Sequence, residues 1–428
     1  MDKKNSAAAA RLTAFLCALA LLISLSACSA PQTPAVKAAD LLENMKAEQV
    51  EGKQTNAAFR KSFLSFSSAL LCAVSDQADS QENVLISPLS VLSALAMTQN
   101  GAAQETLREM ENVLGGDLSA DELNAYLLGY YQSLSDSEDF ALHFAHAIWI
   151  NTALPAEVRK DFLQTNLNYY DPAIRRAAFD NAALRDINQW ADLKTNGMIP
   201  RILNKLDEKA LMVLLNALCF EAKWAKPFTK GNVRTADFTP ENGAKKSITM
   251  MYDSVNTYIG EEGFCSGFKK NYAGSRFSFL ALLPEEGISL KDFIVQLSAD
   301  KLTALADSLQ SESVELGLPR FSFDFDQDLK DALQAMGMEK AFDPDAADFS
   351  RMAETTEKIA IGQVIHKTHI DVDSEGTRAA AVTAVIPTLA TALAKPPVQV
   401  ILNRPFVFML WDNQARLPLF IGAVKDVK

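Results

Sequence analysis

The chain has 428 residues, of which 48% are hydrophobic and 22% are charged, and its net charge at pH 7 is −12. A chain of this length and composition can bury a large hydrophobic core. It has no block of clustered Lys and Arg residues, which binding to nucleic-acid phosphates requires. The charge balance therefore argues against a nucleic-acid partner.

The N-terminus has the pattern of a signal peptide, which takes no part in the fold. Lys3, Lys4 and Arg11 form its positive region, and residues 12–25 form a short apolar core. This apolar run is shorter than the roughly 20 residues that a membrane-spanning helix needs. Residues 1–27 are therefore predicted to be a signal peptide rather than a permanent transmembrane helix.

The signal ends in Leu25-Ser26-Ala27-Cys28, which matches a bacterial lipoprotein signal. In such a signal Cys28 is lipidated and becomes the first mature residue; an ordinary secretory peptide with an incidental cysteine is the alternative. Residues 28–57 are rich in Ala, Pro, Gln, Glu and Lys, and they predict a flexible tether. We therefore expect an extracellular, cell-surface lipoprotein of a bacterial envelope, with a folded domain over residues 58–428.

Three cysteines remain in the expected domain, and they are Cys72, Cys219 and Cys265. Their number is odd, and Cys72 and Cys219 stand among apolar neighbours, as in Leu70-Leu71-Cys72. An odd number of cysteines with apolar sequence neighbours favours buried free thiols over a disulfide framework.

Sequence motifs of enzymes and metal sites are missing from the chain. It contains no Gly-x-Ser-x-Gly, His-Glu-x-x-His, phosphate-loop or Cys-x-x-Cys motif. His143 and His146 could share a helix face as metal ligands, but residues 142–151 read as a strand, where positions three apart face opposite ways. The run from Asp324 to Asp328 starts like a calcium loop but lacks its glycine and its glutamate. We expect no enzyme, no metal and no cofactor.

A series of short motifs, in a fixed order, covers residues 59–427. They include Asn83-Val84-Leu85-Ile86-Ser87-Pro88, Ile187-Asn188-Gln189-Trp190, Leu215-Asn216-Ala217-Leu218, Leu318-Pro319-Arg320-Phe321 and Asn403-Arg404-Pro405-Phe406. Together they resemble the serpins, a family of protease inhibitors. The resemblance implies an α+β serpin fold with three β-sheets, about eight or nine helices and an exposed C-terminal reactive loop over about residues 374–398. It also implies a monomer.

Some serpins carry a basic helix that binds sulfated sugars. The segment that we align with it, residues 107–136, carries more acidic than basic residues. We therefore expect no heparin-type activation.

The resemblance implies a polar cluster beneath the central sheet, at the point where its strands part. His366 resembles the histidine of that cluster, and Ser87, Ser90 and Asn216 are expected beside it. A buried histidine among hydroxyls and an amide satisfies its hydrogen bonds in only a few arrangements. The cluster either controls how readily the sheet opens or is simply a hydrogen-bonded core. Trp224 resembles the tryptophan at the top of the sheet, where the loop enters.

Residues 374–384 read Ser-Glu-Gly-Thr-Arg-Ala-Ala-Ala-Val-Thr-Ala and resemble the hinge of the serpin reactive loop. In strand alternation one face carries only small side chains, while Arg378 falls on the other face. Such a segment can enter between two strands without a clash; an exposed linker or an ordinary strand is the alternative. Ser374 stands where many inhibitory serpins carry glutamate. The expected hinge residues are Gly376, Thr377, Ala379, Ala381 and Thr383.

The resemblance implies an irreversible suicide substrate that traps a serine protease as its acyl-enzyme when the cleaved loop inserts into the sheet. The usual spacing from Gly376 places the scissile bond between Ala390 and Thr391, which suits elastase-like or subtilisin-like pockets. A shift of one to three residues would present Leu389 or Leu393 to a chymotrypsin-like enzyme. Two alternatives are a non-inhibitory serpin acting as a binding or chaperone-like surface lipoprotein, and a lipoprotein that binds a ligand or scaffolds the surface.

Overall fold

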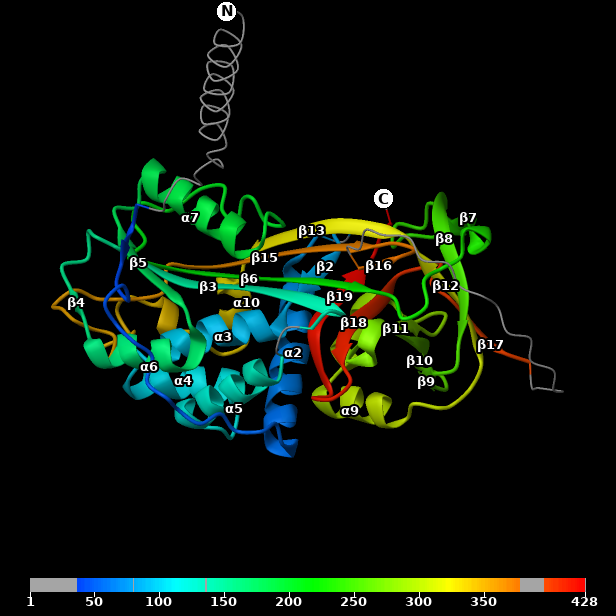
Figure 1. Ribbon diagram of the computed structural model, residues 1–428, viewed down its shortest axis with the longest axis horizontal. Coiled ribbons are helices and arrows are strands. Elements are labelled where there is room, and N and C mark those ends of the chain that lie inside the picture. The colour runs from blue at the N-terminus through cyan, green and yellow to red at the C-terminus, as the bar shows by residue number, and fades with distance from the viewer. Residues whose placement is uncertain (1–36, 80, 135–136, 378–395, 428) are drawn as a thin grey trace, which may run out of the picture. The chain divides into compact units, whose positions relative to one another are not determined.

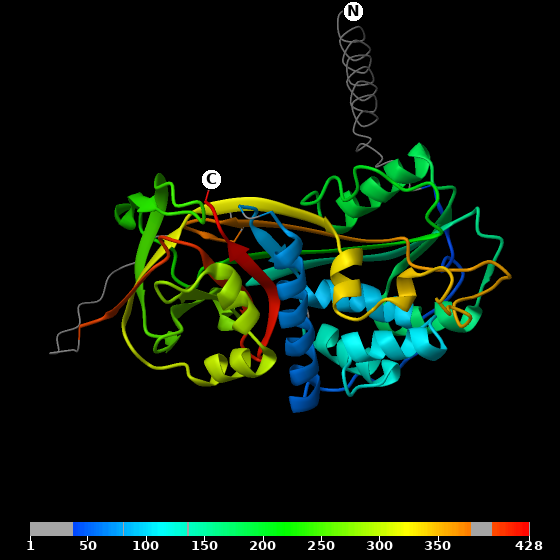
Figure 2. The same ribbon diagram turned by 180° about the vertical axis from the view of Figure 1, so that it is seen from behind.

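The computed structural model describes residues 37–79, 81–134, 137–377 and 396–427 (Figure 1). Within the domain that begins at Ala38, helices cover both faces of one large sheet, with α7 on the face opposite α3 to α6 (Figures 1 and 2). The nine α-helices in the described part of the chain are α2 (Ala57–Gln77), α3 (Pro88–Gln99), α4 (Gln104–Leu114), α5 (Ala120–Ser133), α6 (Lys160–Tyr170), α7 (Asn181–Lys194), α8 (Leu290–Gln296), α9 (Ala299–Asp307) and α10 (Lys330–Ala335).

The large sheet has seven strands in the spatial order β1-β5-β3-β6-β16-β15-β13. Its central strands β6 and β15 pair directly and in parallel at one end, but at the other end β16 lies between them. Its strands are β1 (Ala39–Asp40), β3 (Phe140–Asn151), β5 (Ala173–Ala177), β6 (Met212–Lys223), β13 (Phe321–Asp328), β15 (Gln363–Val372) and β16 (Gly376–Thr377).

Two further sheets complete the core, and a two-stranded sheet pairs β4 (Glu157–Val158) with β14 (Ala353–Glu354). The six-stranded sheet has the order β2-β19-β18-β11-β10-β9 and the four-stranded sheet the order β17-β12-β8-β7. Their strands are β2 (Val84–Ile86), β7 (Val233–Phe238), β8 (Lys246–Val255), β9 (Tyr258–Glu261), β10 (Cys265–Asn271), β11 (Phe277–Pro284), β12 (Val314–Pro319), β17 (Val398–Ile401), β18 (Phe406–Asp412) and β19 (Leu417–Val424). The α+β class and the three main sheets agree with the sequence prediction, and the small fourth sheet was not anticipated.

Helix α3 runs through the core beneath the large sheet, and all twelve of its residues are buried. The sequence specifies its start, because the Ser87 side chain accepts a hydrogen bond from the Ser90 amide and Pro88 follows as the first helical residue. Helix α2 is long and apolar enough to cross a membrane, but eight of its residues are buried in the domain.

The packed domain begins earlier in the chain than the sequence indicated. We expected a flexible segment over residues 28–57, yet the chain from Ala38 onward lies against the domain. Strand β1 extends the large sheet, and the Leu41 amide donates to the Ile174 carbonyl at 2.9 Å. Further on, the Lys53 amide donates to the carbonyl of Ala125 at 2.8 Å. Most of these contacts use backbone groups, so the polar composition did not reveal them.

Strand β3 confirms the reading of residues 142–151 as extended, so His143 and His146 do not share a helix face. Cys72 and Cys265 are free thiols, and Cys219 and Cys265 are buried, whereas Cys72 is only partly buried. Burial raises the pKa of Cys265 to about 12. Among the described residues, no group of three or more His, Cys, Asp or Glu side chains could hold a metal ion.

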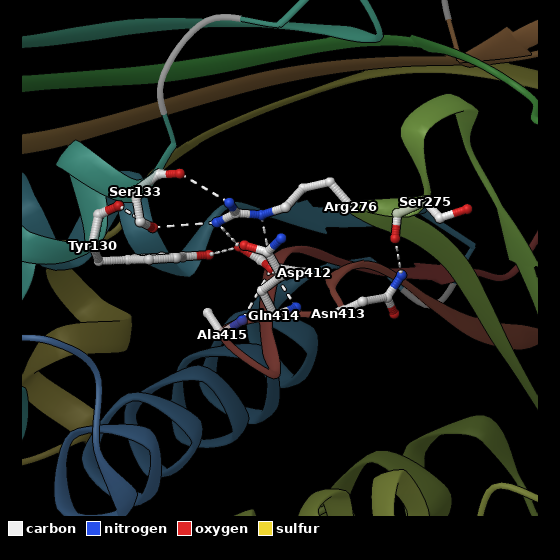
Figure 3. A network of polar contacts seen from close by, with 8 residues as sticks. All are labelled: Tyr130, Ser133, Ser275, Arg276, Asp412, Asn413, Gln414 and Ala415. Carbon is white, nitrogen blue, oxygen red and sulfur yellow. Dashed lines mark hydrogen bonds and ion pairs between the residues drawn. The ribbon is translucent and has the colours of Figure 1, made fainter.

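A buried ion pair anchors the turn between β10 and β11 (Figure 3). The Arg276 guanidinium donates to both carboxylate oxygens of Asp412, at 3.1 and 2.8 Å, and to the Ser133 carbonyl at 2.9 Å. The Asp412 carboxylate is fully buried and also accepts a hydrogen bond from Tyr130 at 3.3 Å. A bidentate pair of this kind fixes geometry as well as charge. It therefore holds the β10–β11 hairpin against β18 and the end of α5.

Candidate functional site

The site begins with a tight turn over residues 373–376, between β15 and β16. The Asp373 amide donates to the Gly376 carbonyl at 3.0 Å, and the Asp373 carboxylate accepts from the amides of Glu375 (2.7 Å) and Gly376 (3.1 Å). Aspartate favours turns because its side chain accepts hydrogen bonds from backbone amides that follow it closely in the chain. The turn sends the chain back antiparallel to β15.

Gly376 is required at its position because the backbone of β6 is very close. A Cβ atom added there would lie 2.2 Å from the Ala222 carbonyl oxygen and 2.8 Å from the Cα of Lys223. Gly376 and Thr377 pair with Lys223 and Ala222, respectively. No larger residue fits between the two strands without moving them.

Thr377 is the first hinge side chain to enter the sheet. It is only 2% exposed, it pairs with Val372 of β15 and Ala222 of β6, and its hydroxyl lies 2.6 Å from the Tyr272 hydroxyl. Burial raises the pKa of Tyr272, and the hydrogen bond to Thr377 opposes this shift. The other expected hinge residues, the two residues of the expected scissile bond and the expected lipidation site lie outside the described residues: Ala379, Ala381, Thr383, Ala390, Thr391 and Cys28.

Residues 224–228, here called the latch, hold the turn from the β6 side. The Trp224 amide donates to the Glu375 carbonyl, its indole nitrogen donates to the Asp373 carbonyl, and the Phe228 amide donates to the Ser374 carbonyl, each at 2.9 Å. The Trp224 ring also stacks on Tyr272, with ring centroids 4.4 Å apart. The structure thus places Trp224 where the loop segment enters the sheet.

The four residues expected beneath the sheet lie together and are fully buried. The Ser87 amide donates to Nε2 of His366 at 3.1 Å, and Nδ1 of His366 lies 2.6 Å from Oδ1 of Asn216. Ser90 donates to the same amide oxygen at 3.4 Å. Because Nε2 accepts, the proton of the neutral imidazole must be on Nδ1, which then donates to Asn216. Burial lowers the pKa of His366 to about 3, so the ring is neutral at physiological pH.

Sequence reasoning gave His146 no place in this cluster. His146 extends the cluster into a polar row, which runs across β15, β6 and β3 through His366, Asn216 and His146. Its position in β3 pairs with Asn216 of β6, which in turn pairs with His366 of β15. Nε2 of His146 lies 3.0 Å from the Tyr131 hydroxyl, which lies 2.6 Å from Ser93. Burial lowers the pKa of His146 to about 4, with a smaller contribution from Lys194.

A sequence signal for the longer row does exist. Ser87, Ser90 and Ser93 are spaced by three residues, which places them on one face of a helix. Such a serine face predicts polar partners in whatever packs over it. The partners belong to strands far away in sequence, so only the structure identifies them.

Lys270 was also missed, and it forms a buried ion pair with Asp253 at 2.7 Å behind the latch. Nothing in Phe268-Lys269-Lys270 distinguishes a buried lysine from a solvated one. Burial lowers the pKa of Lys270, and the neighbouring Asp253 opposes this shift.

Comparisons with known proteins agree with this architecture. An uncharacterized serpin-like protein of Thermococcus kodakarensis is 31% identical over 360 residues, covering 82% of each chain. The thermophilic serpin tengpin in its native state is 40% identical with a TM-score of 0.87, covering 92% of this chain and all of tengpin; for its latent state the TM-score is 0.77. Human thyroxine-binding globulin with thyroxine is 25% identical, with a TM-score of 0.77, covering 86% of this chain and 98% of that one. A family model described as serpin (serine protease inhibitor) matches residues 61–427. The chain therefore belongs to the serpin family.

Proposed function

We propose that this protein is an irreversible suicide-substrate inhibitor of extracellular serine proteases. The observation that carries the proposal is the position of β16, whose two residues already lie between β6 and β15 in antiparallel register. Insertion of a cleaved serpin loop is a known case of strand addition to a sheet. Here β16 lies at the position where such an addition would start, and the matching family model is described as serine protease inhibitor.

The register of β16 specifies what further insertion must do. If each later loop residue pairs with one residue further back along β6 and β15, Thr383 comes opposite both Asn216 and His366. These two residues now pair directly with each other. Insertion therefore has to separate the two strands and break the His366–Asn216 hydrogen bond. The hydrogen bonds of the polar row therefore raise the energy barrier to loop insertion.

The energy of insertion is large enough for a trap. About 14 inserted residues at roughly 3.3 Å each would carry a tethered protease about 45 Å. If each new ladder hydrogen bond contributes about 1 kcal/mol net, insertion yields on the order of 10 kcal/mol. The whole free energy of unfolding of an ordinary domain has a similar size. This is sufficient to distort an acyl-enzyme before it hydrolyses.

The scissile bond is proposed to be the one between Ala390 and Thr391. The loop segment from Val385 to Ala394 contains no Lys or Arg, so a trypsin-like pocket with a buried carboxylate has no partner. A small scissile residue fits the shallow pocket of elastase-like or subtilisin-like proteases. Leu389 and Leu393 are the alternatives, and they would direct the inhibitor to a chymotrypsin-like enzyme.

The protein is further proposed to act at a bacterial surface as a lipoprotein monomer anchored through Cys28. Because the described chain lies on the domain from Ala38 onward, only about ten residues separate the anchor from the fold. Fully extended, such a segment reaches about 35 Å. The inhibitor would therefore act close to the membrane, on proteases that reach the cell surface.

The test is to mix the chain lacking residues 1–37 with an elastase-like protease and to examine the products on a denaturing gel. We expect a covalent band of inhibitor and protease, and a released C-terminal fragment whose mass places its first residue at Thr391. Subtilisin-like and chymotrypsin-like enzymes serve as parallel targets. Complete cleavage of the loop without a covalent band from any of the three would instead support a non-inhibitory binding or chaperone-like protein.

A further inference from the structure

Behind the latch, one buried ammonium group, that of Lys270, joins the six-stranded sheet, the four-stranded sheet and the latch. Lys270 belongs to β10 of the six-stranded sheet and is 2% exposed. Its Nζ donates to Asp253 of β8, in the four-stranded sheet, at 2.7 Å. It also donates to the carbonyl of Lys226, within the latch that follows β6 of the large sheet, at 2.9 Å.

The third interaction of this ammonium is with aromatic rings of the latch. Nζ lies 4.4 Å from the Phe228 ring centroid and 5.5 Å from that of Trp224. An ammonium has three donors and a positive charge, and here it has a carboxylate, a carbonyl and an aromatic face as partners. An apolar side chain of the same length could fill the space but could not join these groups.

We propose that Lys270 is a positioning residue for loop insertion, a role that rests on the proposed inhibitory function. The latch supplies three hydrogen bonds to carbonyls of residues 373–375, and Lys270 binds the latch carbonyl between Trp224 and Phe228. The turn at 373–376 sets the register with which Gly376 and Thr377 enter the sheet. By holding the latch, Lys270 keeps this starting register in place, so that the cleaved loop inserts faster than the acyl-enzyme hydrolyses.

The test is the Lys270→Met variant, which keeps the length of the side chain and removes its charge and donors. Two quantities are measured against one cleaving protease: the ratio of cleaved free inhibitor to covalent complex, and the hydrogen exchange of the Trp224 and Phe228 amides. We expect the ratio to rise about fivefold, which corresponds to about 1 kcal/mol in the insertion barrier. Exchange of both amides should accelerate. The rate of loop cleavage should stay unchanged, because the proposed scissile bond follows Thr377 by more than ten residues in the chain.

Lys425→Met is the matched control. Lys425 is also buried, at 8% exposure, and its Nζ donates to the Asp79 carbonyl at 2.9 Å, but it does not contact the latch. A purely structural effect of losing a buried lysine should appear in both variants. A change of the ratio in Lys270→Met alone supports the positioning role, and an equal change in both overturns it.

Asp253→Asn gives a second variant if Lys270→Met fails to fold. It keeps the shape of the partner and removes the charge that pairs with both Lys270 and Lys226 of the latch, so it should change the ratio in the same direction. Unchanged exchange at the latch in either folded variant overturns the role of Lys270, whether or not a protease is trapped. A wild-type chain that forms no covalent complex contradicts the proposed function instead, and faster exchange in the variants would then still show that Lys270 holds the latch.

Discussion

The Thr377→Arg variant is expected to be cleaved by its target protease without trapping it. Thr377 is 2% exposed between β6 and β15, and its hydroxyl is bonded to Tyr272. An arginine at this position would bury its guanidinium without a carboxylate partner, and burial of an unpaired charge costs several kcal/mol. The hinge would then leave the sheet, and insertion would start too late to compete with hydrolysis of the acyl-enzyme.

The measurement is the yield of covalent complex per cleaved inhibitor at equal amounts of protease. We expect at least a tenfold loss for the arginine variant, corresponding to a barrier change of about 1.4 kcal/mol or more. Thr377→Ser is the control, since it keeps the hydroxyl and remains small, and it should trap nearly as well as the wild type. An arginine variant that traps at the wild-type yield would refute entry of Thr377 as the first step.

The native fold is expected to lose stability as the pH falls from about 6.5 to about 4, because of the two buried histidines. Burial lowers the pKa of His366 to about 3 and that of His146 to about 4, whereas a histidine in an unfolded chain titrates near 6.5. Below pH 6.5 the unfolded chain therefore binds protons that the native chain does not, and the free energy of unfolding decreases. At pH 5 the loss is about 2 kcal/mol for each histidine.

Carboxylates also contribute to acid unfolding, so a variant is needed to isolate the histidine. His366→Gln should destabilise the protein at pH 7.5, since it disturbs the bonds to Ser87 and Asn216. The difference in unfolding free energy between wild type and variant should then shrink by about 2 kcal/mol at pH 5, because only the wild type has this proton to bind. Chemical denaturation at both pH values measures it. A difference independent of pH would mean that His366 titrates normally in the fold.

The hinge of the loop could be predicted from the sequence, because small residues alternate after Gly376. This alternation identifies a segment that fits between strands, and the structure indeed has Thr377 buried there. The partners of Ser87 and Ser90 in the polar cluster could be anticipated only through the family resemblance, because Asn216 and His366 lie more than a hundred residues from these serines and from each other. Sequence alternation showed that His143 and His146 face opposite ways, but not which of them faces α3.

What the sequence left out has a common physical cause. Residues 38–56 bind the domain largely through backbone hydrogen bonds, so their Glu- and Lys-rich composition reads as a free linker. Lys270 is buried because a carboxylate from another sheet and a latch carbonyl meet it in the fold. A charged residue signals burial only through such partners, and no local pattern encodes them.

Thermal unfolding of the intact chain and of the chain cut within residues 378–395 tests loop insertion most directly. If the cut loop adds about 10 kcal/mol of new sheet, the Tm of a domain of this size should rise by about 10 °C or more. The cut chain should also resist binding of a synthetic peptide with the sequence of residues 377–389, because its own loop occupies the position between β6 and β15. A cut chain that unfolds at the same temperature as the intact one would contradict insertion, and with it the proposed trapping mechanism.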